Sequence, residues 1–197
     1  MTDALTIDRP IEGRISRYRD KAVEQHGPER FLSDLDQLLA VQGVETVRWE
    51  QFTPYFNDGD ACEFGTGEVR VKLAERFGVD EYGGDYADGY ITSYSLWSYG
   101  EVDEEPKRYL DKDGIPTDSY LYNSPNPAYH AWSAKKYDES NKVFSLNGQD
   151  TTEIYAALSA FESNMANFES VLLNNFGDPA LVTATTDGFS VEYYEHD

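Results

Sequence analysis

The densest group of side chains able to do chemistry lies in residues 49–60, which read WEQFTPYFNDGD. The oxygen atoms of Asn57, Asp58 and Asp60 are the type that a hard cation prefers. The same residues favour an ordinary turn. Asn-Asp-Gly suits a tight turn of the chain, and the preceding aromatic rings would anchor that turn against a core. We prefer the turn and assign no metal or cofactor. The motif residues, whose role the sequence leaves open, are Trp49, Phe52, Tyr55, Phe56, Asn57, Asp58 and Gly59.

No catalytic residue can be assigned from local spacing. The three histidines, His26, His130 and His196, are too far apart in the chain to form a local metal or base motif. Residues 111–118 begin like a calcium loop, but the ligand spacing and closing glutamate of an EF-hand are absent. A metal-dependent hydrolase or nuclease, using carboxylates of residues 57–60 with His130 or His196, is therefore an alternative interpretation. The leading interpretation is a protein without enzymatic activity.

A second candidate site is a tyrosine-rich and acidic segment, residues 81–90, whose glycines argue against a helix. Tyrosine offers a large rigid contact area with a polar tip, and carboxylates would select a basic partner. The sequence equally allows the tyrosines to fold back onto a sheet. The residues predicted to contact a partner are Tyr82, Asp85, Tyr86, Asp88 and Tyr90.

The charge narrows the choice of partner. The chain of 197 residues has 16 Lys and Arg against 37 Asp and Glu, a net charge of -21. This charge disfavours direct binding to nucleic-acid phosphates or to anionic membranes. Residues 151–197 contain no Lys or Arg, so a helix there must present its carboxylates to solvent or to a basic partner.

The same composition predicts a cytoplasmic protein. No apolar stretch is long enough for a membrane span, and the first thirty residues lack an apolar signal core. Cys62 is the only cysteine, which excludes an intrachain disulfide and a thiolate zinc cage. We expect Cys62 to be a small buried residue.

Two helices are expected to open the fold as a helical hairpin over about residues 8–43. The first, about 8–26, has apolar residues at helical spacing and ends at Gly27-Pro28. The same pair begins the second helix, which ends near Gly43. Its apolar stripe is Phe31, Leu35, Leu38 and Leu39.

A mostly antiparallel sheet with a long loop is expected over about residues 44–149. Val69, Val71 and Leu73 alternate with Arg70 and Lys72, which is typical of a half-buried strand. Residues 90–99, rich in β-branched and aromatic side chains, predict another strand. Residues 100–126 are polar and interrupted by prolines and glycines, which indicates a long loop.

A long helix is the clearest element, at about residues 150–176. The sequence Asp150-Thr151-Thr152-Glu153 is a capping signal. Apolar residues then recur at spacings of three and four. We expect this seam to pack on the chain's own helices or sheet, and a homodimer through residues 154–172 is the alternative. The seam consists of Ile154, Leu158, Phe161, Met165, Phe168 and Leu172.

A terminal hairpin over about residues 180–195 completes a single α+β domain, residues 1–197. With Asp187-Gly188 at the turn, Ala184 should pair with Val191 and Val182 with Tyr193. The shared apolar face would contain Val182, Ala184, Phe189, Val191 and Tyr193.

The run WEQFTPYFNDG resembles the W-x-Q-[YF]-T-P-Y-F-N-D-G motif of a family of uncharacterised proteins from bacteriophages and their bacterial, especially actinobacterial, hosts. The endings Phe176-Gly177-Asp178, Asp187-Gly188-Phe189 and Tyr194-Glu195-His196-Asp197 resemble the end of the same family. The resemblance covers about a fifth of the chain and implies a viral or prophage origin and an intracellular site of action. It implies no activity.

The sequence therefore predicts an acidic binding protein, phage-encoded, that engages a basic surface on a host protein in the cytoplasm of the host cell. The most specific version of this prediction is a DNA mimic, whose carboxylates take the place of phosphates. The alternatives are the metal-dependent nuclease and a structural component of the virion, for which the helical seam is the only hint.

Overall fold

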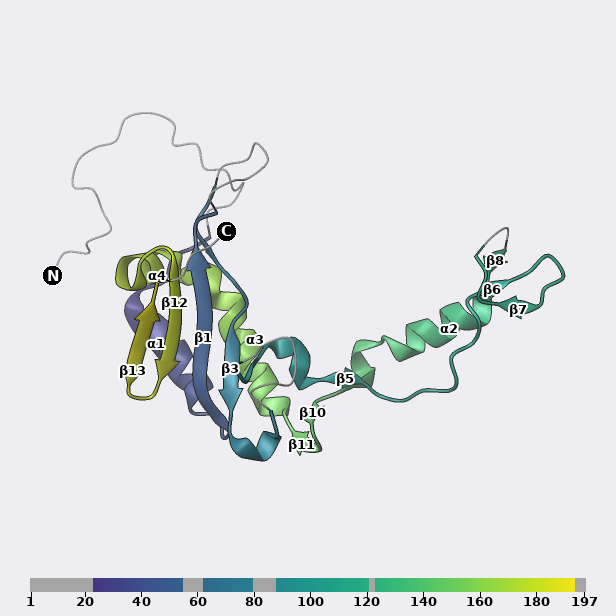
Figure 1. The fold of residues 1–197 in the computed structure, drawn as a ribbon, viewed down its shortest axis with the longest axis horizontal. Helices are drawn as coiled ribbons and strands as arrows, with labels where there is room; N and C mark the ends of the chain where they lie inside the picture. The colour runs from purple at the N-terminus through teal and green to yellow at the C-terminus, as the bar shows by residue number, and fades with distance from the viewer. Residues whose placement is uncertain (1–22, 55–61, 80–87, 121–122, 194–197) are drawn as a thin grey trace. The chain divides into compact units, whose positions relative to one another are not determined.

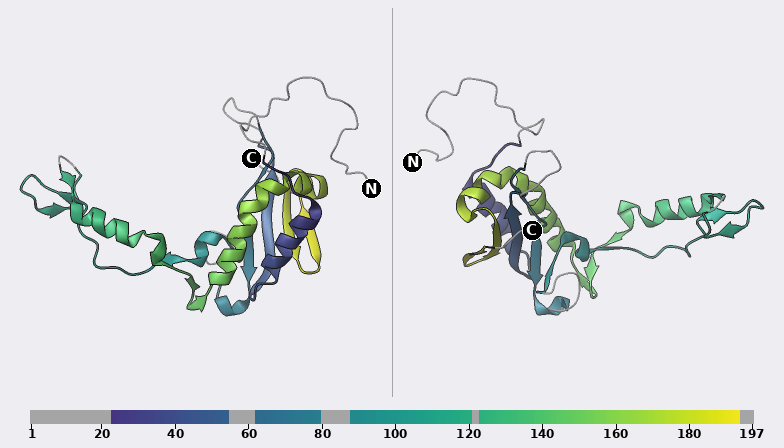
Figure 2. Two further views of the ribbon diagram at one scale, coloured as in Figure 1. Left: turned by 180° about the vertical axis from the view of Figure 1, so that it is seen from behind. Right: turned by 45° about the horizontal axis from the view of Figure 1, so that its top comes forward.

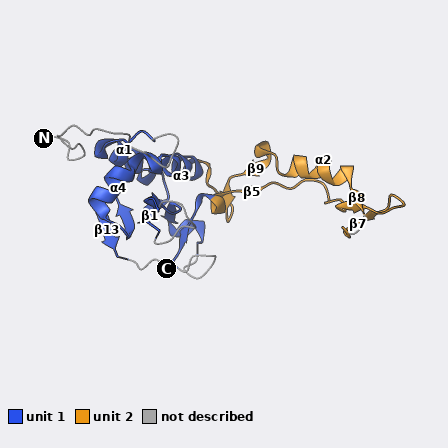
Figure 3. Cartoon of the chain, turned by 90° about the horizontal axis from the view of Figure 1, so that it is seen from above, with its two compact units in different colours: residues 1–93, 153–197 blue, residues 94–152 orange. Residues whose placement is uncertain are grey.

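The computed structural model describes residues 23–54, 62–79, 88–120 and 123–193 (Figure 1). The fold is α+β, as predicted. The chain divides into two compact units, unit 1 with residues 1–93 and 153–197, and unit 2 with residues 94–152 (Figure 3). The single domain expected over residues 1–197 stays a prediction.

Within the described residues, unit 1 has one N-terminal helix, α1 (Pro28–Leu39), where two were expected. Gly27 precedes the helix and Pro28 occupies its first turn, because a missing N–H costs nothing there. The predicted stripe of Phe31, Leu35, Leu38 and Leu39 is buried. Most of the expected first helix lies outside the described residues. Its last part, residues 23–26, is not helical, and the His26 N–H donates instead to the Asn167 carbonyl (2.8 Å).

The sheet of unit 1 has six antiparallel strands, in the order β13-β12-β1-β3-β4, with β2 paired to β1. The alternation of Val69, Val71 and Leu73 is confirmed, since all three are buried. The strand expected over residues 90–99 is wrong in extent. It is interrupted by the 3-10 helix η2 (Ser93–Leu96), whose Ser93 hydroxyl donates to Glu162 (3.2 Å). The strands are β1 (Val44–Phe52), β2 (Gly65–Thr66), β3 (Arg70–Leu73), β4 (Tyr90–Ile91), β12 (Ala180–Thr185) and β13 (Gly188–Glu192), and a 3-10 turn, η1 (Glu75–Phe77), follows β3.

The long helix runs over residues 152–176 in three pieces, α3 (Thr152–Asn164), the 3-10 turn η4 (Met165–Phe168) and α4 (Glu169–Phe176). Asp150 accepts from the Thr152 N–H at its start (2.9 Å). All six residues of the predicted seam are buried within the chain. A homodimer through this seam would therefore require these side chains to leave the core.

The helices α1, α3 and α4 lie on one face of the sheet (Figures 1 and 2). The Phe31 ring is central to the packing between them. Its centroid lies 6.0 Å from those of Trp49 and Phe161, and 5.4 Å from that of Phe168. Aromatic burial of this kind supplies a large share of a core's stability.

The terminal hairpin forms, but its predicted register is wrong. Ala184 pairs with Phe189 and Val182 with Val191, a shift of two residues. The turn consists of Thr186 and Asp187, and Gly188 begins β13 with φ 142°. Because side chains alternate with a period of two, this shift keeps the predicted residues on one face.

Unit 2 consists of short elements. β5 (Ser98–Tyr99) pairs with β9 (Lys142–Val143), and β10 (Ser145–Leu146) pairs with β11 (Gln149–Asp150). The predicted loop at residues 100–126 contains a small sheet of β6 (Tyr109–Leu110), β7 (Pro116–Thr117) and β8 (Ser124–Pro125). Two-residue strands leave no periodic signal in a sequence. The helix α2 (Pro127–Lys136) and the turn η3 (Glu139–Asn141), which follow, were not predicted.

Candidate interaction surfaces

The first part of the aromatic motif is a structural clasp, formed by Trp49 and Gln51 against the end of α4. Both side chains are buried. The Trp49 indole N–H donates to the Gln51 side chain (3.1 Å), and the Gln51 amide donates to the carbonyls of Leu172 (3.2 Å) and Gly177. Buried polar groups are costly unless they are paired, so this network fixes β1 against the helix.

A second contact extends the clasp at the end of β1. The Thr53 backbone N–H and hydroxyl donate to the two carboxylate oxygens of Asp178, at 2.8 and 2.6 Å. Residues 49–53 and 176–178, two segments on which the sequence resemblance depends, are therefore bound to each other. Phe52 is half-buried and pairs with Gly65 in β2. The motif residues Tyr55, Phe56, Asn57, Asp58 and Gly59 lie outside the described residues.

Two of the five predicted partner contacts, Asp88 and Tyr90, are described, and both interact with Arg48. The Arg48 guanidinium lies 3.8 Å from the centroid of the Tyr90 ring and forms an ion pair with Asp88. The Thr46 hydroxyl donates to the Tyr90 hydroxyl (2.9 Å), and Tyr90 is buried. Tyr90 therefore belongs to the sheet, whereas Asp88 is exposed. Tyr82, Asp85 and Tyr86 lie outside the described residues.

An aromatic row in unit 2 was missed by the sequence analysis. Neighbouring ring centroids lie 5.0 Å apart for Trp97 and Tyr99, 5.2 Å for Tyr99 and Tyr137, 6.2 Å for Tyr137 and Trp132, and 5.8 Å for Trp132 and Tyr129. None of these five side chains is fully buried. Only the spacing of Tyr129 and Trp132 on one helix was visible in the sequence, because the other rings come from distant segments.

Cations lie at both ends of the aromatic row. The Lys142 ammonium is 4.0 Å from the centroid of Trp97, and the Arg108 guanidinium is 5.5 Å from that of Tyr129. In the middle, the Trp132 indole N–H donates to the Asp103 carbonyl (2.7 Å). These contacts order unit 2 without deep burial.

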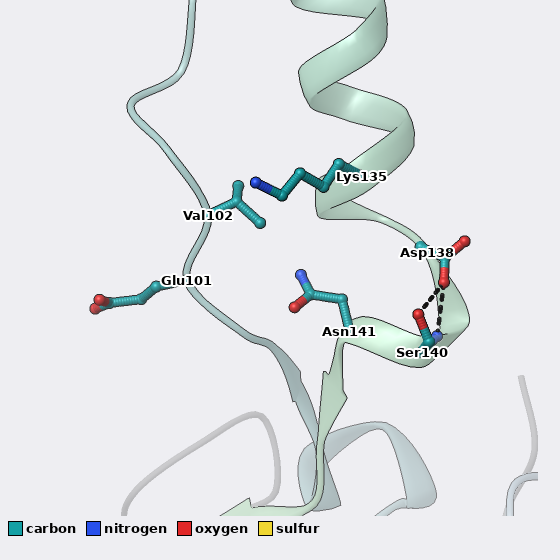
Figure 4. A pocket seen from close by; sticks show the side chains of 6 residues that line it. All are labelled: Glu101, Val102, Lys135, Asp138, Ser140 and Asn141. Carbon is teal, nitrogen blue, oxygen red and sulfur yellow. Dashed lines mark hydrogen bonds between the residues drawn. The ribbon is translucent and has the colours of Figure 1, made fainter.

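A shallow hollow in unit 2 lies between residues 101–102 and the segment from Lys135 to Asn141 (Figure 4). Its polar groups are largely used within the chain. Lys135 donates to Asp103 (2.9 Å), and this hydrogen bond, together with the charge of Lys135, lowers the pKa of that carboxyl. The Ser140 hydroxyl and N–H both donate to Asp138 and lower its pKa. Glu101 points away from Lys135.

The described bases are largely neutralised by the chain itself. Seven of them form ion pairs with acids, namely Arg30, Arg48, Arg70, Lys107, Arg108, Lys135 and Lys142. Arg76 donates to the Gln42 carbonyl, and Lys136 to those of Tyr99 and Gly100. Carboxylates are in excess, so exposed ones such as Asp36, Glu45 and Glu153 carry negative charge on unit 1.

The described residues offer no metal centre: no group of three His, Cys, Asp or Glu is placed to hold an ion within these ranges. His130 is exposed on α2, while Asn57, Asp58, Asp60 and His196 lie outside the described residues. The Asp111 carboxylate accepts from the N–H groups of Asp113 (2.8 Å) and Ile115 (2.9 Å), as in an ordinary turn. Cys62 is exposed, contrary to expectation.

No helix in the described ranges combines the length and the apolar character that crossing a bilayer requires. The sequence matches no protein-family model, and comparisons with curated proteins and with solved structures found no similar protein. The resemblance to the phage and actinobacterial family stays a prediction.

Proposed function

We propose that this protein is an acidic binding protein without enzymatic activity, phage-encoded and cytoplasmic, that engages a basic surface on a host protein. The observation that carries the proposal is the pairing of the described bases within the chain. Because these cations are already bound, the surplus carboxylates of unit 1 are left to attract a partner of opposite charge.

The attraction acts over a distance set by the salt concentration. At physiological ionic strength the screening length is about 8 Å, so exposed carboxylates guide a basic partner only at close range. A nucleic-acid-binding protein has such a basic surface, and the DNA mimic is the sharpest form of the proposal.

The test compares two variants with the same change of charge. In unit 1, Asp36→Asn, Glu45→Gln and Glu153→Gln remove three exposed carboxylates. In unit 2, Glu101→Gln, Glu104→Gln and Asp113→Asn remove three others. None of the six side chains holds one of the ion pairs described above.

Each protein is immobilised and titrated with purified basic nucleic-acid-binding proteins of the bacterial host, over a series of salt concentrations. We expect the unit 1 variant to bind about tenfold more weakly at low salt, since exposed charge pairs contribute about 0.5 kcal/mol each. The unit 2 variant should bind nearly as the unchanged protein does. Duplex DNA should displace the partner if the protein is a mimic. Binding that is unaffected by salt, or absent for every basic partner, would contradict the proposal.

A further inference from the structure

The strand β13 is an edge of the sheet. Among the residues that the structure describes, it is the end member of the order β13-β12-β1-β3-β4 and pairs with β12. In Figure 1 it is drawn in yellow beside β12. An edge strand has one row of backbone N–H and C=O groups directed away from its sheet, which is a template for another strand.

The hairpin register shows which groups these are. In a two-residue hairpin the flanking residues, here Thr185 and Gly188, exchange backbone hydrogen bonds, and this alternates along the strands. Gly188, Ser190 and Glu192 therefore direct their backbone groups towards β12. Phe189 and Val191 direct theirs outwards.

The side chains of the same two residues are apolar and exposed. Phe189 is 41% exposed and Val191 is 46% exposed, on the face that also bears the buried Val182 and Ala184. The Phe189 ring lies 5.0 Å from Phe176 and 6.3 Å from Phe31, measured between centroids. An added strand would thus find both hydrogen-bonding groups and an apolar surface continuous with the core. The strand has neither proline nor lysine, the residues that commonly block such edges.

The negative charge of the chain indicates which kind of segment pairs with the β13 edge. A second copy could pair antiparallel about Ser190, with Phe189 opposite the partner's Val191, but it would bring two chains of net charge -21 together. A basic segment instead gains from Glu192 and Asp187, which flank the edge. We propose that β13 is the docking edge for an extended segment of a protein partner, in which apolar and basic residues alternate. Only the basic character of the segment rests on the proposed function.

The experiment uses a short synthetic peptide of alternating Val and Lys, with blocked ends and a fluorescent label, and measures its binding to the full chain by anisotropy. A second peptide has the same residues but N-methylated alternate amides, which keeps the charge and removes strand donors. Val191→Pro removes the outward N–H without breaking the β12 ladder. Val191→Lys and Leu173→Lys are matched in charge, and the replaced side chains are 46% and 44% exposed.

We expect N-methylation, Val191→Pro and Val191→Lys each to weaken binding by about tenfold or more. N-methylation and Val191→Pro remove backbone hydrogen bonds, whereas Val191→Lys removes the apolar contact and places a positive charge against the basic peptide. Leu173→Lys should have a much smaller effect. Hydrogen exchange should slow at the Phe189 and Val191 amides when the peptide binds. Circular dichroism of each variant checks that the fold is kept, and Val191→Lys tests the edge if Val191→Pro does not fold.

Three outcomes would overturn the inference. If the N-methylated peptide bound as strongly as the unmodified one, the attraction would be due to charge alone. The proposed function would then stand, but β13 would not be a docking edge. Absence of peptide binding at low salt would exclude β13 as a docking edge. A dimer of the unchanged protein that Val191→Pro makes monomeric would assign the edge to a second copy. By contrast, the peptide could bind strongly at β13 while the titration with basic host proteins is unaffected by salt. That result would contradict the proposed function and leave the docking edge intact.

Discussion

Unit 1 and unit 2 are each stabilised internally by different forces. Unit 1 has a core in which Phe31 contacts the rings of Trp49, Phe161 and Phe168. In unit 2 the buried residues among those described are Leu96, Asn126 and Thr151, and α2 has none. Burial of apolar area stabilises unit 1, whereas caps, ion pairs and partly exposed rings order unit 2.

This difference predicts how each unit responds to change. A core transmits the loss of one side chain to the whole unit, because its atoms are closely packed. Contacts at a surface are separately weak and respond to their own solvent conditions. Substitutions in unit 1 should therefore change global stability, and those in unit 2 should change local order.

The largest expected effect is that of Trp49→Ala in unit 1. The buried indole would leave a cavity and free the Gln51 side chain, at a cost of about 3–5 kcal/mol. Chemical denaturation monitored by circular dichroism measures the free energy of unfolding. Trp132→Ala is the control, since it removes the same ring from the half-buried row of unit 2 and should cost about 1 kcal/mol or less. Similar costs for the two would contradict the comparison.

The next effect concerns the polar part of the clasp. Gln51→Leu keeps the volume but leaves the Trp49 indole N–H and the carbonyls of Leu172 and Gly177 without their partner. The expected cost is about 2 kcal/mol, because these groups lie in the interior. Gln37→Leu, at an exposed position of α1, is the matched control and should change stability by about 0.5 kcal/mol or less. If Gln51→Leu were as mild as this control, the clasp would not stabilise unit 1.

Periodic sequence patterns predicted unit 1 better than unit 2. The stripe of α1, the alternation around β3 and the seam of residues 154–172 each reflect one buried face, so their residues could be named in advance. The hairpin register could not, since a shift of two residues leaves the faces unchanged. The clasp and the aromatic row join residues far apart in the chain, such as Gln51 with Gly177 and Tyr99 with Tyr137. No local pattern encodes such pairs.

A smaller effect is expected from the cap of α2 in unit 2. The Asn126 side chain accepts from the Ala128 N–H (3.0 Å) and donates to the Lys107 carbonyl (2.6 Å). Asn126→Ala should cost about 1 kcal/mol locally and speed hydrogen exchange in α2, while the denaturation midpoint of unit 1 stays the same. Asn126→Ser restores the acceptor and should recover most of the protection. Loss of protection throughout unit 1 would show that the two units unfold together.

The smallest effect is a pH dependence confined to unit 2. Lys135 lowers the pKa of the Asp103 carboxyl below its ordinary value of 3.8, because it donates a hydrogen bond to the carboxylate and attracts its charge. A lowered folded-state pKa means that this contact stabilises the fold above the ordinary value and is lost as pH falls through the lowered one. The pH dependence of the contact between Lys107 and Asp118 has the opposite sign. Asp118 raises the pKa of the Lys107 ammonium above 10.5, so this contact is complete below that value and is lost only as pH rises further.

These contacts should therefore stay constant across the neutral range. Carboxyl NMR should find the Asp103 inflection below 3.8, and Lys135→Met should move it upward towards the ordinary value. The packing of Phe31 on Trp49, Phe161 and Phe168 should not follow this titration, since none of these four rings ionises. An Asp103 inflection that is already ordinary in the unchanged protein would remove the ion pair from the forces that order unit 2. The cap, the aromatic row and the other ion pairs of unit 2 would then have to maintain that order.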